Sequence, residues 1–128
     1  MSKEADKVKK TDVDSYGEVR IADDVVGNIA AIAATEIEGV AGTVGNATKE
    51  LMTRMGFNPR SKGVKVVIDR NMVTLDMALF MKYGYNIPIT SKQVQERVKT
   101  SVENMTGLTV VNVGIRIVGI DMEEPALN

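Results

Sequence analysis

Side chains that could act as acids, bases or nucleophiles are few in this sequence. Its 128 residues include no cysteine and no histidine, which excludes thiolate zinc sites, cysteine nucleophiles and Ser-His pairs. Asp69 and Asp76 flank one predicted hairpin, but we interpret Asp76 as a solvent-facing or hydrogen-bonded strand residue, because buried acids are rare unless paired. We therefore predict no catalytic residue, no metal site, no cofactor and no small-molecule substrate, and hence no enzyme.

Three glycines recur at every third residue in the segment Gly39–Gly45. Its two overlapping G-x-x-G steps have the spacing with which a KH module clamps a nucleic-acid backbone. KH loops generally place Lys or Arg between the glycines, whereas this segment has Val, Ala, Thr and Val there. We interpret the segment as a structural turn, with a KH-like RNA-binding module as the alternative.

The middle and the end of the chain hold the candidate partner contacts. Apolar residues line one side of a short helix predicted within Asn46–Phe57, and methionines such as those found there adapt to interaction surfaces. Basic residues cluster around the loop that follows, where the alternatives are a solvated loop and a patch for a partner or anionic lipid. The candidate contacts are Leu51, Met52, Arg54, Met55, Arg60, Lys62 and Arg116.

The charge balance and the hydropathy limit the partners and the location. Sixteen basic and 17 acidic residues give a net charge of −1, whereas proteins that track a phosphate backbone normally carry a basic excess. The N-terminal MSKEADKVKKTDVD lacks the apolar stretch of a signal peptide, and no apolar run reaches the ~18–20 residues that span a bilayer. We expect a cytoplasmic chain without nucleic-acid partners or direct membrane insertion.

The length and composition suit one folded domain between two tails. An apolar content of 44% with 26% charged residues is ordinary for a globular fold, and 128 residues suffice for one domain. Residues 1–14 are charged and almost free of apolar side chains, which predicts a disordered tail. We place a single domain at residues 15–122 and a short acidic tail at residues 123–128.

Hydrophobic periodicity predicts a strand and a helix in the first third of the chain. Alternation at Tyr16–Ile21 indicates a short strand. Asp23 is the expected N-cap of a helix that follows at once. Its apolar stripe recurs at three- and four-residue spacing as far as Val40.

The alternation is strongest in two segments, residues 64–69 and 73–81, which are separated by a short connection. Arg70 and Asn71 form this connection, and Asn tolerates the positive φ that a two-residue hairpin needs. The two segments therefore form an antiparallel pair.

A second helix and a last strand complete the order β-α-β-β-α-β. The helix begins near Pro88 and ends at Gly107, a left-handed cap. The strand covers Leu108–Ile120, with Val111, Val113, Ile115 and Ile117 expected on one face. This order predicts an α+β fold, an antiparallel or mixed sheet with two helices packed on one face. The alternative is a KH-like or ring-building αββαβ module.

Several stretches together resemble the alkaline shock protein family, the Gls-type general stress or envelope stress response proteins of Gram-positive bacteria. No single stretch is specific, but their order and spacing are. In the place of the family's frequent Ser-Pro-Glu helix start, this chain has Ala22-Asp23-Asp24. The stretches are Tyr16–Ile21, Ile29–Gly42, Ser61–Val66, Tyr83–Pro88, Val94–Val98, Glu103–Leu108 and Val118–Ile120.

The resemblance implies a non-enzymatic stress-response protein of cell-envelope homeostasis. Family members gather at the membrane, in at least some cases, through an integral membrane partner, so we expect a self-associating scaffold recruited by a membrane-anchored protein. Self-association would use the strands at Tyr16–Ile21 and Leu108–Ile120, because edge strands with few charges invite pairing. The alternative implied by another subgroup, whose gene lies beside those of acetyl-CoA carboxylase, is a regulator linked to fatty-acid synthesis.

Overall fold

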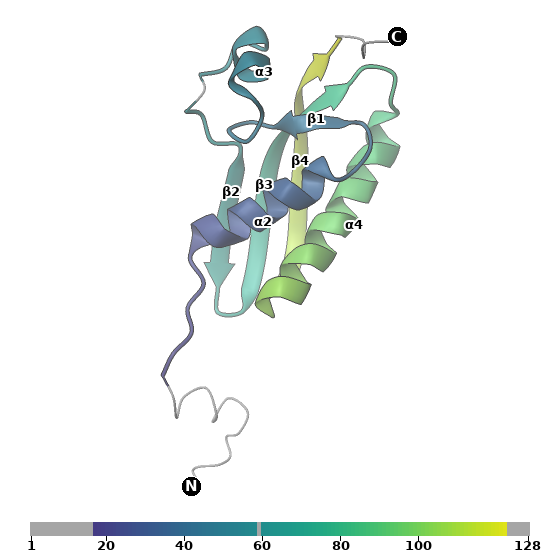
Figure 1. Cartoon of the computed structure of the whole chain (residues 1–128). Helices are drawn as coiled ribbons and strands as arrows, with labels where there is room; N and C mark the ends of the chain where they lie inside the picture. Colours follow the sequence, from purple (N-terminus) through teal and green to yellow (C-terminus); the bar gives the residue numbers. More distant parts are fainter. Residues whose placement is uncertain (1–16, 59, 123–128) are drawn as a thin grey trace, which may run out of the picture.

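The central strand of the sheet is β3 (Met72–Lys82), which is paired along both of its edges. The computed structural model describes residues 17–58 and 60–122 (Figure 1); the two tails predicted at residues 1–14 and 123–128 lie outside them. The other described elements, in chain order, are α2 (Asp23–Thr35), β1 (Val40–Thr43), α3 (Lys49–Arg54), β2 (Val64–Asp69), α4 (Ile87–Thr106) and β4 (Thr109–Asp121).

The four strands form a mixed sheet. β4 runs parallel to β3 over the full length of β3, and α4 makes the crossover between them. The opposite edge of β3 is shared by two antiparallel strands: β2 pairs with Met72–Met77, and β1 pairs with Leu79–Met81. This arrangement confirms the predicted α+β fold, its mixed sheet and the hairpin of β2 and β3.

The alternating side chains of β3 reach two separate apolar clusters. One set, from Val73 to Met81, is buried under α2 and α4, which cover the same face of the sheet (Figure 1). The other set includes Ala78 and Phe80, which α3 covers on the opposite face. Below α3 that second face is open, and Asp76 and Met72 are exposed there. Two helices on one face were predicted, and α3 adds a small patch on the other.

The predicted first strand is wrong for the described part of its range. Residues 17–21 form no strand, and the Val19 side chain is 79% exposed. The strand that pairs with the upper end of β3 is β1, inside the glycine segment interpreted as a turn. The G-x-x-G steps therefore lie in and beside a paired strand instead of an exposed loop.

Two expectations for the first helix are also wrong. Ala22 occupies the N-cap position and makes no side-chain cap; Asp23 begins the helix, where its charge suits the helix dipole. The helix ends at Thr35, and Val40, expected on its stripe, belongs to β1. A turn separates the two elements, and in it the Val40 N–H donates to the Ile37 carbonyl. The three- and four-residue spacing of apolar residues therefore continues past the end of the helix and into a strand.

Two details of the strands differ from the sequence pattern. Arg70, not Asn71, has the positive φ in the hairpin turn, at 61°. In β4 the register shifts once after Val110 and again after Ile117. A shift of one residue moves the following side chains to the other face, which is why Val110 and Val113 are buried while Val111 is 54% exposed.

The bounds of the second helix are as predicted, whereas Met105, on the same side as the buried valines in the sequence pattern, is 72% exposed. The Asn86 side chain caps α4 by accepting a hydrogen bond from the Ile89 N–H at 2.9 Å, and Pro88 lies in its first turn. Gly107 ends it in the left-handed conformation with φ 78°. Val94, Val98 and Val102 are fully buried against the sheet.

Candidate functional site

The apolar candidate contacts on α3 are mostly buried, and they pack the helix against the sheet. Leu51 and Met52 are 6% and 1% exposed and pack with Phe80 of β3, whereas Met55 is partly buried at the edge of the same cluster. The Phe57 ring meets Phe80 edge to face, with ring centroids 5.3 Å apart. A partner contact by these residues stays a prediction, and burial limits it to Met55.

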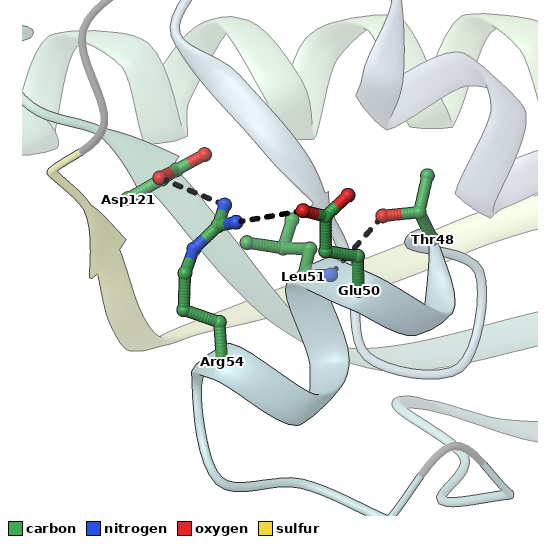
Figure 2. A network of polar contacts seen from close by, with 5 residues as sticks. All are labelled: Thr48, Glu50, Leu51, Arg54 and Asp121. Atoms are coloured by element: carbon green, nitrogen blue, oxygen red, sulfur yellow. Dashed lines mark hydrogen bonds and ion pairs between the residues drawn. The ribbon is translucent and has the colours of Figure 1, made fainter.

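Arg54 connects α3 to the far end of β4 (Figure 2). Its guanidinium donates to Asp121 Oδ1 at 3.2 Å and lies 3.9 Å from Glu50 Oε2, one turn earlier on the helix. The Thr48 hydroxyl caps α3 by accepting from the Leu51 N–H at 3.1 Å. These contacts hold a six-residue helix that would be marginal alone. A partner that binds Arg54 would have to compete with Asp121 and Glu50 for its guanidinium.

Arg60 and Lys62 lie on a cleft of about 540 Å³ between the start of α2 and the segments that leave β1 and enter β2. Those two segments cross at very short range. A Cβ at Gly45 (φ +92°) would lie 2.5 Å from the Ser61 carbonyl oxygen, and one at Gly63 would lie 2.5 Å from Val44 Cβ. Only residues without a side chain permit this crossing, so the two glycines fix the wall of the cleft.

Thr43, at the end of β1, lies in this cleft and is fully buried. Its hydroxyl oxygen has no hydrogen-bond partner within residues 17–58 and 60–122. Asp23 and Asp24 line the cleft on the α2 side, and basic side chains line it on the other. Sequence reasoning placed Arg60 and Lys62 in a basic cluster but missed the acids and Thr43; the clustered glycines were the one available signal.

The outer edge of β4 carries Arg116, which is exposed. Among the described strands β4 pairs with β3 alone, so its other edge has no strand beside it. Between Thr109 and Ile120 Arg116 is the single charged residue. The two register shifts bound a regular stretch, Asn112–Ile117, in the middle of this edge.

A surface that the sequence did not single out surrounds the start of α4. Tyr83, Tyr85, Ile87 and Ile89 are 39–67% exposed. The Tyr85 ring packs on Gly39, where a Cβ would lie 2.7 Å from Tyr85 Cδ2, and its hydroxyl donates to Glu38 Oε2 at 3.1 Å. This hydrogen bond, together with partial desolvation and the negative charge of Glu38, raises the pKa of Tyr85 above its ordinary value.

The described residues contain neither a cluster of metal ligands nor a helix suited to span a membrane. Nowhere in residues 17–58 and 60–122 do three or more His, Cys, Asp or Glu side chains gather as metal ligands would. Over the same residues, none of the helices has the length and apolar character needed to cross a membrane.

Comparison with known proteins places the chain among stress-related and envelope-related proteins. It is 37% identical over 110 residues to the uncharacterized protein YqhY of Bacillus subtilis, covering 86% of this chain and 82% of YqhY. It is 26% identical over 110 residues to a stress response regulator gls24 homolog of Streptococcus pyogenes, covering 84% of this chain and 61% of that protein. Among solved structures, a MamM CTD variant matches 77% of this chain and 95% of its own, with 12% identity and a TM-score of 0.49.

A family match decides the assignment. The Asp23 family (a family name, unrelated to residue 23 here), described as having a cell envelope-related function, matches residues 11–122. This match covers nearly the whole chain and agrees with the resemblance to alkaline shock proteins. The chain belongs to the Asp23 family of cell envelope-related proteins.

Proposed function

We propose that this protein is a non-enzymatic scaffold of the envelope stress response, which self-associates through the outer edge of β4 and is recruited to the membrane by an anchored partner protein. The observation that carries the proposal is the outer edge of the 13-residue strand β4, which pairs with no strand of the described residues. The family's envelope-related function supports the setting.

The β4 edge has the properties of a strand that accepts another strand. Every second residue of an edge strand directs its backbone N–H and C=O away from the sheet, and these groups require hydrogen-bond partners. Natural edges are protected by charges, prolines and bulges. β4 has no proline and a single charged residue before Asp121, and a regular stretch, Asn112–Ile117, lies between its bulges. α4 caps part of this edge, because the Gln95 side chain donates to the Val113 carbonyl at 2.8 Å and the Glu103 carboxylate accepts from the Val110 N–H at 2.9 Å. Pairing with another strand would use the rest of the stretch. Two copies paired antiparallel about a two-fold axis would extend the sheet across both molecules.

Recruitment by a protein, and not by lipid, is supported by the charge. Anionic lipid surfaces attract polybasic segments by about 1 kcal/mol per basic residue. A chain with a net charge of −1 has little to gain from such a surface. The basic candidates Arg60 and Lys62 face two carboxylates across a cleft, which lowers the local positive potential further.

Sedimentation velocity over a range of concentrations tests the self-association. We expect the natural chain to form dimers or larger species, and a Val111→Lys/Asn112→Lys variant to remain monomeric, because lysines on an edge oppose pairing. Val67→Lys is the matched control: Val67 is 51% exposed on β2, against 54% for Val111. A monomeric natural chain, or an edge variant that assembles like the control, would refute the proposal.

Flotation with liposomes tests the recruitment. Purified protein should stay at the bottom of the gradient with vesicles rich in anionic lipid and should float when detergent-solubilised host membrane proteins are reconstituted into them. Flotation with protein-free anionic vesicles would show that the chain binds lipid directly.

A further inference from the structure

We infer that the cleft between α2 and the β1 and β2 segments binds a small zwitterionic ligand, with its ammonium group at Asp23 and Asp24, its oxyanion at Arg60 and Lys62, and a polar atom on the Thr43 hydroxyl. This inference is independent of the proposed function. It adds a ligand site to a protein for which no substrate is expected.

The Thr43 hydroxyl is the first observation. Thr43 is paired with Leu79 in the sheet, and directly paired residues point to the same face. Leu79 belongs to the cluster under α2 and α4, so the Thr43 side chain points beneath α2, into the cleft. A fully buried hydroxyl that finds no hydrogen-bond partner among the described residues costs free energy. A ligand atom in the cleft would supply the missing hydrogen bond.

The distribution of charge is the second observation. Asp23 and Asp24 lie on one side of the cleft, and Arg60, Lys62 and Lys65 on the other. Within the described part of the chain these side chains form no ion pair with one another or with any other residue. The facing charges are therefore available to a molecule that carries both signs.

This arrangement selects the class of ligand. A simple anion would be attracted by the basic side and repelled by two carboxylates, and a simple cation would meet the reverse. A molecule with a separated ammonium and oxyanion satisfies both sides at once. The cleft of about 540 Å³ falls within the roughly 300–1,000 Å³ usual for small-molecule sites, and the crossing at Gly45 and Gly63 holds its wall in place.

Dipeptides provide probes that separate the charges. We would titrate the full, isotope-labelled chain with Ala-Ala, with N-acetyl-Ala-Ala, which lacks the ammonium, and with Ala-Ala amide, which lacks the carboxylate. Amide resonances of Thr43, Gly45 and Gly63 should shift saturably with Ala-Ala. The two blocked probes should bind at least about tenfold more weakly, the loss of one charged contact. Absence of saturable shifts, or equal binding of all three probes, would overturn the inference.

Two variants test the assigned roles. Thr43→Val keeps the shape of the side chain and removes the hydroxyl, so it should weaken Ala-Ala binding about tenfold without lowering the midpoint of thermal unfolding. Thr74→Val, on the open face of β3, is the matched control and should leave binding unchanged. If Thr43→Val lowers the midpoint of thermal unfolding and leaves Ala-Ala binding intact, the hydroxyl binds an internal water and not the ligand. The inference would then be wrong.

Lys62→Gln gives a test that does not disturb the core, because Lys62 is exposed. It should weaken Ala-Ala and N-acetyl-Ala-Ala and leave the weak binding of Ala-Ala amide unchanged. An equal effect on all three probes would contradict the placement of the oxyanion.

Discussion

Individual glycines determine how closely the backbone segments of this fold approach one another. Gly45 combines a positive φ with a close approach, since its Cβ would lie 2.5 Å from the Ser61 carbonyl oxygen. Gly84 has nearly the same φ, +99° against +92°, but nothing lies within 4 Å of its Cβ position. An alanine at Gly84 would therefore meet only the strain of the left-handed backbone, whereas an alanine at Gly45 would meet this strain and steric crowding.

We expect Gly84→Ala to lower the free energy of unfolding by about 1–2 kcal/mol, the usual cost of a left-handed alanine. Gly45→Ala should cost a further ~1–3 kcal/mol, because the Ser61 backbone must also move. Urea denaturation of both variants measures the difference. Equal losses at the two sites would mean that the crossing at Gly45 is easily relaxed.

Residue types predicted part of the candidate site and could not predict the rest. Arg60 and Lys62 are close in sequence, so their shared location was evident. Thr43 and Asp23 are 20 residues apart, and they meet only because α2 folds over the end of β1. No local pattern encodes that packing, and an isolated threonine gives no sign that its hydroxyl will be buried without a partner.

Elements with strong local signals were predicted nearly to the residue. Pro88 and Gly107 predicted both ends of α4, and alternation predicted the hairpin of β2 and β3. β1 was missed because its four residues form a strand only through pairing with β3, and tertiary pairing overrides weak local preference. The faces of β4 were partly misassigned, because bulges depend on the neighbouring strand and leave no periodic trace.

α3 is the element that depends most on packing, because a six-residue helix has little stability alone. Met52→Ala should lower the free energy of unfolding by about 2–5 kcal/mol, since it opens a cavity against Phe80. Met105→Ala, with a methionine 72% exposed on α4, should change it by less than about 0.5 kcal/mol. Thermal and urea unfolding measure both, and a similar small effect at the two sites would show that α3 is loosely attached.

At the scale of the whole molecule, the coverage of the sheet is uneven. α2 and α4 cover one face, α3 covers the upper part of the other, and no other described strand lies beside the long outer edge of β4 (Figure 1). A second copy at that edge would pair the outward-facing backbone groups of β4, and it would take over the Val113 carbonyl from the Gln95 side chain of α4. This geometry connects the shape of the fold to the proposed scaffold role.

Hydrogen–deuterium exchange at a series of protein concentrations tests the β4 interface most directly, because pairing protects the amides that it engages. The outward-facing amides of Asn112–Ile117 should exchange more slowly as the concentration rises, while those of β2, on the opposite edge of the sheet, should exchange at a constant rate. Exchange in β4 that is independent of concentration, in samples shown by sedimentation to be assembled, would contradict the account.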